Sequence, residues 1–132
     1  MIVQRISKYS LHVYFDTADI QNLSALLHQD LLSIQIQYLK QDKITSKILS
    51  CVIDENELLQ IESSKIVFQI DGDTQQYMLY LLSEFMVTGD FPVNECCELA
   101  IAKLKYNVQI YFLNIANFSK NIKNPCEIKA KS

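Results

Sequence analysis

The chain has 132 residues, 49% of them hydrophobic, and a formal net charge of −3. This length predicts one domain, with enough apolar surface for a core that needs no disulfide or metal. The first ten residues lack the apolar run of a secretory signal, and no stretch approaches 18 consecutive apolar residues. We therefore expect a soluble cytoplasmic protein that does not contact membranes.

The first half of the chain predicts a strand, a helix and a hairpin. The segment SLHVYFD alternates between apolar and polar side chains, as a half-buried strand does. Asp16 or Thr17 can cap a helix over residues 18–30, where apolar residues recur at helical spacing. Residues 33–40 alternate again, and residues 44–54 can return beside them as the second strand of a hairpin.

The second half predicts three helices and two strands. Asp54 and Glu57 form a capping-box pattern for a short helix over residues 54–64. Asp73 can cap the segment TQQYMLYLLSEFMVT, and Gly89 can end that helix. The remaining expected elements are a strand over residues 65–71, a helix over residues 94–105 and a strand over residues 106–113.

The order β-α-β-β-α-β-α-α-β predicts an α+β fold. We expect one layered domain over residues 1–115, with a mixed or mainly antiparallel sheet of about five strands and helices packed on it. Residues 116–132 are polar and rich in Lys and Asn, which indicates a loosely ordered tail. No internal repeat of 20 to 50 residues is evident.

The adjacent pair Cys96 and Cys97 lies in the predicted helix NECCELAIAKLK. Successive helical residues differ by about 100°, so the two thiols should diverge. A zinc site needs four converging ligands and a redox pair normally uses CxxC spacing, so we expect Cys96 and Cys97 to pack in the core or at its flank. All four cysteines, Cys51 and Cys126 included, are expected to carry free thiols. A reactive thiol in the first helical turn is the alternative.

No pattern predicts catalysis, a metal or a cofactor. The string DGDTQ resembles the start of a calcium loop, but Leu82 occupies its twelfth position, where calcium loops carry glutamate. His12 and His28 belong to no hydrolase signature, and the two glycines form no phosphate-binding loop. We therefore expect a protein that is not an enzyme, with a small His- or Cys-dependent enzyme as the third-ranked alternative.

Acidic side chains are concentrated in the middle of the chain. Residues 54–100 contain ten Asp or Glu and a single base, Lys65, whereas residues 101–132 contain six bases and one acid. Helix caps and solvated faces would explain many of these acids. The functional interpretation is an acidic docking surface, because complementary charge speeds encounter with a basic partner. Direct binding of nucleic acid is not expected, since this surface would repel phosphates.

A small acidic chain without catalytic motifs is typical of a protein-binding protein, in particular a bacterial immunity protein that masks a basic toxin such as a nuclease. The main alternative is a secretion-type chaperone or dimeric adaptor, which would bind through apolar faces; the oligomeric state is left open. For the inhibitor hypothesis, Glu84 lies on a different helix from the expected partner-binding acids and serves as the control for their mutation. The expected partner-binding residues are Glu55, Glu57, Glu62, Asp90, Glu95 and Glu98.

Overall fold

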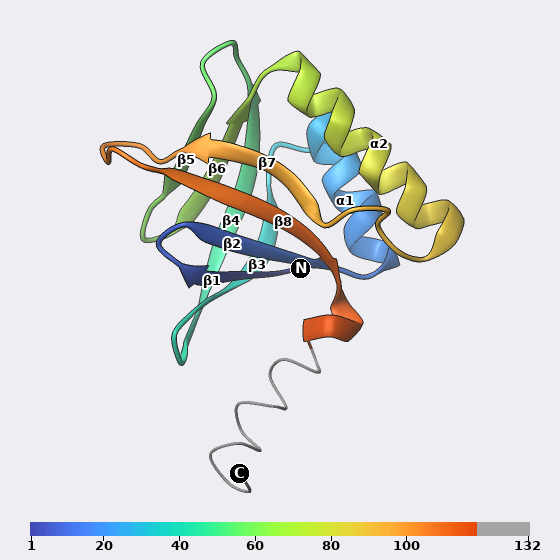
Figure 1. The fold of residues 1–132 in the computed structure, drawn as a ribbon, viewed down its shortest axis with the longest axis horizontal. Helices are drawn as coiled ribbons and strands as arrows, with labels where there is room; N and C mark the ends of the chain where they lie inside the picture. Colours follow the sequence, from blue (N-terminus) through green and yellow to red (C-terminus); the bar gives the residue numbers. More distant parts are fainter. Residues whose placement is uncertain (119–132) are drawn as a thin grey trace, which may run out of the picture.

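The computed structural model describes residues 1–118. Eight strands form one sheet in the order β5-β6-β4-β3-β1-β2-β8-β7 (Figure 1). The strands are β1 Ile2–Ser7, β2 Ser10–Phe15, β3 Ile34–Lys40, β4 Lys43–Ile53, β5 Leu58–Ile61, β6 Lys65–Ile70, β7 Glu95–Ala100 and β8 Asn107–Asn114. The helices are α1 Thr17–Leu27 and α2 Gly72–Thr88, and residues 115–118 add one helical turn.

The two outer strands of this sheet meet, so the sheet is a nearly closed barrel. Leu59 of β5 pairs in parallel with Ile101, which follows β7. The Ala102 amide donates to the Leu59 carbonyl at 2.8 Å. Inward-facing side chains from all eight strands fill the barrel together with the buried faces of α1 and α2. Closure leaves few unpaired backbone groups at sheet edges.

The expected five-stranded layered fold is therefore wrong. Residues 2–7, for which no element was expected, form β1, and strands replace the predicted helices over residues 54–64 and 94–105. A register shift between Glu95 and Cys97 breaks the alternation of β7. This bulge places the buried residues Cys96 and Leu99 three positions apart, a spacing that resembles a helix.

The contacts of Asp54 and Glu57 explain why the helix predicted over residues 54–64 does not form. Asp54 accepts a hydrogen bond from the Asn56 amide at 2.9 Å and so makes a turn rather than starting a helix. Glu57 reaches across to the start of α2, where it accepts from the Asp71 amide at 3.1 Å and from the Thr74 hydroxyl. The residue that caps α2 is Asp71, not Asp73 as expected.

Other local predictions are confirmed. Asp16 caps α1 in a capping box with Asp19, and α2 ends at Gly89, whose φ of 85° lies in the left-handed region that glycine tolerates. The hairpin predicted from residues 33–40 and 44–54 forms as β3 and β4. The expected tail lies outside the described residues, except for the start of its range at 116–118.

The fold consists of two halves with the same order of elements, an internal symmetry that the sequence did not predict. Strands β1, β2, β3 and β4 with α1 correspond to β5, β6, β7 and β8 with α2. Each half is a hairpin, a helix and a second hairpin. The first strands of the two hairpins run parallel, β1 beside β3 and β5 beside β7. The halves join through the parallel pairs β2–β8 and β4–β6, which also correspond to each other.

The buried residues of the two halves match at a separation of 55 positions. Three inward residues of β2 correspond to three of β6, and three core leucines of α1 correspond to core residues of α2. The helix caps match at the same separation. The matched residues are Leu11, Val13, Phe15, Asp16, Leu23, Leu26 and Leu27 in the first half, and Ile66, Phe68, Ile70, Asp71, Met78, Leu81 and Leu82 in the second.

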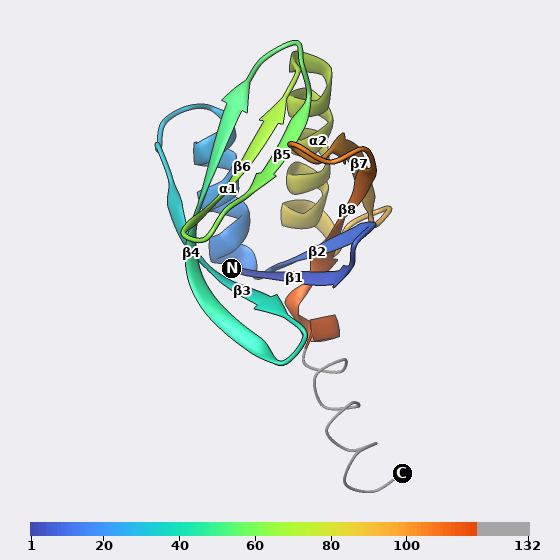
Figure 2. The ribbon, with the colours of Figure 1, turned by 90° about the vertical axis from the view of Figure 1, so that its left-hand side faces the viewer.

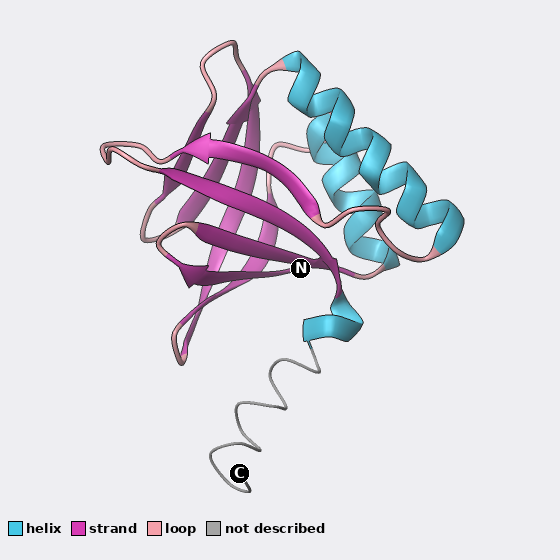
Figure 3. Ribbon diagram, in the orientation of Figure 1, coloured by secondary structure: helices cyan, strands magenta, loops and turns pink. Residues whose placement is uncertain are grey.

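This arrangement gives the barrel two different ends. The hairpin end comprises the four turns at residues 8–9, 41–42, 62–64 and 101–106. The helix end comprises α1, α2, the loops that flank them and the β4–β5 connection at residues 54–57. Figures 1 and 3 show the hairpin turns on the left and the two helices together on the right. Figure 2 looks from the hairpin end, with the helices behind the strands.

Candidate functional site

Charge is separated between the two ends of the barrel. All eight Lys and Arg residues of the described range 1–118 lie in or beside the hairpin turns, together with the acids Asp42, Glu62 and Glu98. The other eleven acids of that range lie at the helix end, where it has no Lys or Arg. The basic residues are Arg5, Lys8, Lys40, Lys43, Lys47, Lys65, Lys103 and Lys105.

The six acids expected to bind a partner do not lie together. Glu55 and Glu57 lie beside the beginning of α2, whereas Asp90 and Glu95 follow its end. A 17-residue helix separates these pairs by roughly 25 Å. Glu62 and Glu98 lie at the hairpin end, and Asn107 donates to Glu98 at 2.8 Å. Their role in partner binding stays a prediction.

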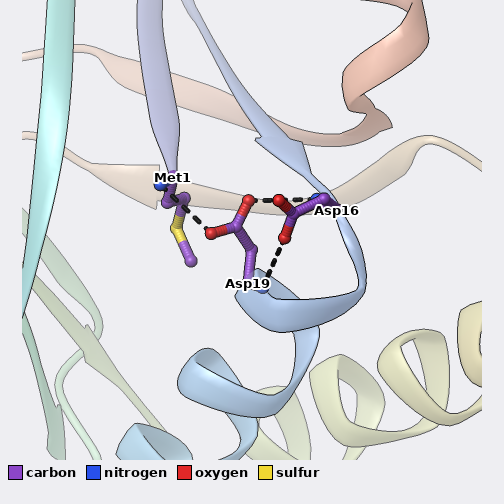
Figure 4. A network of polar contacts seen from close by, with 3 residues as sticks. All are labelled: Met1, Asp16 and Asp19. Atoms are coloured by element: carbon purple, nitrogen blue, oxygen red, sulfur yellow. Dashed lines mark hydrogen bonds and ion pairs between the residues drawn. The ribbon is translucent and has the colours of Figure 1, made fainter.

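Several acids at the helix end have structural contacts. Asp19, although buried, lies 3.1 Å from the Met1 amine and accepts from the Asp16 amide at 3.0 Å (Figure 4). Asp16 in turn accepts from the Asp19 amide at 2.8 Å. This backbone hydrogen bond is the main reason that the pKa of Asp16 is lowered. Glu84, the intended control, is half-buried on α2 and belongs to the same end.

An apolar groove runs between the two helices at this acidic end. It has a volume of about 770 Å³ and is lined by residues of α1 and α2 and by the loop after α1. Met86 and Val87 contribute its exposed apolar surface, and the Val87 side chain is 80% exposed. Asp30 and His28 line the groove near the end of α1. Apolar surface exposed beside a single sign of charge is typical of a protein-binding region.

A second hollow opens at the hairpin end. It has a volume of about 400 Å³, and Arg5, Lys8 and Lys40 line it together with Ile61 and Tyr106. The Arg5 guanidinium donates to the Ser7 and Lys8 carbonyls at 2.8 and 2.9 Å. These bonds hold the guanidinium at the mouth of the barrel. The sequence did not predict this site because its residues are far apart in the chain; the grouping of every described base around the turns was the available signal.

The cysteines and histidines of residues 1–118 do not gather into a cluster that could hold a metal ion. Cys51, Cys96 and Cys97 carry free thiols; the first two are buried and Cys97 is half-buried, while Cys126 lies outside the described residues. Burial raises the pKa of Cys51 to about 12. Among residues 1–118, no three His, Cys, Asp or Glu side chains are placed to hold a metal ion.

The two histidines lie far apart in the fold. His12, on the outer face of β2, lies 3.2 Å from the Tyr14 hydroxyl, and burial lowers its pKa. His28 is the C-cap of α1, at the helix end. Neither is hydrogen-bonded to a cysteine within the described residues. This arrangement gives no support to nucleophilic catalysis by these groups.

Comparison with known proteins adds no family. No protein-family model, no curated protein and no solved structure matches the chain. Within residues 1–118, no helix has both the length and the apolar character needed to cross a membrane.

Proposed function

We propose that the chain is a non-enzymatic binding protein that masks a basic protein partner with its helix end. The observation that carries this proposal is the coincidence of eleven carboxylates, no Lys or Arg among the described residues, and the apolar groove at one end of the barrel. Charge of one sign attracts a cationic partner from a distance, while the groove supplies apolar contact area. A bacterial immunity-type inhibitor of a basic toxin, such as a nuclease, is the specific form that we propose.

The occupant of the groove would be an amphipathic segment of that partner, with apolar side chains for Met86 and Val87 and Lys or Arg beside them. Charge complementarity favours a basic segment because Asp30 lines the groove and Asp90 follows the helix that carries Val87. A secretion-type chaperone or adaptor would use the same apolar surface without needing the carboxylates. Salt dependence therefore separates the two functions.

The first experiment isolates the partner from the source cells on tagged protein, with washes at about 50 mM and about 500 mM salt. The captured protein is then tested for an activity that rebinding abolishes. We expect a basic protein that is released or weakened by salt and inactivated by the chain. Recovery of unfolded clients, independent of salt, would instead support the chaperone.

A matched pair of variants then places the interface. Glu55 and Glu62 are both exposed loop residues, and they flank the four-residue strand β5 at its opposite ends. Glu55→Lys should lower the association rate with the captured protein several-fold at low salt, whereas Glu62→Lys changes the same charge at the hairpin end and should have little effect. Equal rates for both variants would refute binding through the helix end.

A further inference from the structure

The two halves of the barrel differ in the side chains that face inward near the hairpin end. Val3 pairs with Tyr38 in the first half as Leu59 pairs with Ile101 in the second, so Tyr38 and Ile101 correspond. Two positions beyond Val3 and Leu59 on the inward faces lie Arg5 and Ile61. The first half thus places polar groups where the second half is apolar.

In β4, Lys47 is likewise a polar residue at a position that is apolar in the second half. Leu49 pairs with Ile66 as Ile110 pairs with Leu11, so the positions two residues earlier, Lys47 and Val108, also correspond. Val108 is fully buried, and the Lys47 side chain is only 8% exposed. A lysine at a position that suits valine costs free energy unless its ammonium group is hydrogen-bonded.

The buried lysine is held in a defined place. Its ammonium group donates to the carbonyls of Glu62 and Ser63 and lies 5.0 Å from the centre of the Tyr38 ring. Burial lowers the pKa of Lys47 and raises that of Tyr38, while Arg5 acts on Tyr38 in the opposite direction. Because its pKa is raised, the Tyr38 hydroxyl stays protonated at neutral pH, and it lies beside Arg5 and Lys47.

Two hollows meet at this position. The hollow that contains Arg5, Lys8 and Lys40 also has an apolar wall formed by Ile61, Ile101 and Leu104. A neighbouring hollow, of about 470 Å³, includes Tyr38 and Lys47 and shares Lys40 with the hollow that contains Arg5. Polar groups from the first half thus face apolar groups from the second across one opening.

The cations of the first hollow are not neutralised by direct contacts within the described range. Arg5, Lys8 and Lys40 form no ion pair with another residue of the range 1–118, whose ion pair joins the Met1 amine to Asp19. The Lys8 ammonium group instead lies over the Tyr9 and Tyr106 rings, 5.2 and 5.1 Å from their centres. A concave site with charge of one sign concentrates ions of the opposite sign.

We propose that the hairpin end binds a small amphipathic anion. Arg5 and Lys40 hold its carboxylate or phosphate group, and its apolar body lies against Ile61, Ile101 and Leu104. The volume of about 400 Å³ falls in the range of small-molecule sites. Because this site is at the opposite end of the barrel from the groove between the helices, the inference is independent of the proposed function.

The test uses three naphthalene probes and the full chain. Sodium 2-naphthoate and 2-naphthyl phosphate carry the two candidate head groups, and naphthalene-2-methanol is their neutral analogue. Titrations followed by amide chemical shifts should give saturable binding of at least one anion with a Kd below about 1 mM. The shifted amides should lie in the turns at residues 41–42 and 101–106, and the alcohol should bind at least about tenfold more weakly.

Variants separate a built site from a general attraction to the basic end. Arg5→Gln should weaken the anion about tenfold or more, because it removes charge-assisted hydrogen bonds. Lys105→Gln makes the same charge change at the same end, but Lys105 lines neither hollow, so it should have an effect of less than about threefold. Lys40→Gln, at an exposed position, repeats the test if Arg5→Gln does not fold.

Several results would overturn the inference. These are the absence of saturable shifts for both anions, equal binding of the neutral alcohol, and shifts that lie along α1 and α2. Equal effects of Arg5→Gln and Lys105→Gln would also refute it, since nonspecific attraction would then suffice. Binding of only one of the two anions identifies its head group as the ligand class.

Discussion

Asp16 and Asp71 occupy the same position in the two halves of the barrel. Each directly follows a strand, β2 or β6, and caps the next helix. Each also accepts a hydrogen bond at 2.8 Å from the amide three residues later. Their second contacts differ. The Asp16 amide donates to Asp19 on its own helix, whereas the Asp71 amide donates to Glu57 from another loop. One local motif is thus completed locally in one half and by tertiary contact in the other.

Removing the first cap should destabilise the fold. Asp16→Ala deletes the acceptor for the Asp19 amide and should lower the free energy of unfolding by about 1 kcal/mol. Asp16→Asn keeps a side-chain acceptor and is the matched control, with a much smaller loss. Urea unfolding followed by circular dichroism measures both. Equal losses in the two variants would show that the cap itself does not stabilise α1.

The same caps should make stability depend on pH. Hydrogen bonds from backbone amides lower the pKa of both Asp16 and Asp71, so their folded-state pKa lies below the unfolded value of about 3.9. The resulting stabilisation is present above that value and is lost as the pH falls through the lowered pKa. Urea midpoints of the wild type and an Asp16→Asn, Asp71→Asn double variant should converge as the pH falls below about 4. A constant gap would contradict this origin.

The described thiols should react at different rates. Burial raises the pKa of Cys51 to about 12, and the pKa of Cys96 is raised by a hydrogen bond with the Cys97 side chain and, to a lesser extent, by burial. Both should therefore resist iodoacetamide near pH 8, because the thiolate is the nucleophile. Half-buried Cys97 should be modified first, as shown by peptide fragmentation in the mass spectrometer. Rapid modification of Cys51 in the folded protein would contradict the buried position of that strand.

Hydrogen exchange at Ala102 tests whether the barrel is closed. The Ala102 amide donates to the Leu59 carbonyl, although Ala102 lies in the β7–β8 connection. Its hydrogen exchange should be slow, whereas the amide of exposed Lys103 should exchange quickly. Ala102→Pro removes the donor and should destabilise the fold, with increased exchange in β5. Fast exchange at both amides would favour an open sheet.

The candidate sites were only partly predictable from the sequence. The local excess of acids indicated a negative surface, and it included Glu55 and Asp90 at the helix end. However, it also grouped Glu62 and Glu98 with them, because neighbours in sequence need not be neighbours across a barrel. The basic site went unpredicted because its charged residues come from β1, from the turn between β1 and β2, and from β3 and β4. Only the closed sheet brings these residues around one opening.

By itself, the sequence determined the elements whose signals are local. Asp16 and Gly89 define helix boundaries through backbone hydrogen bonds and a left-handed φ, and the alternation in residues 33–40 predicts a strand because side chains of a strand alternate. The tertiary structure determined that β5 and β7 are strands rather than parts of the predicted helices. Their backbone groups are satisfied by pairing with β6 and β8, and that pairing overrides the helical spacing of residues 94–105. The separation of charge between the two ends likewise exists only once the strands have closed, since the barrel alone sets which turns share an end.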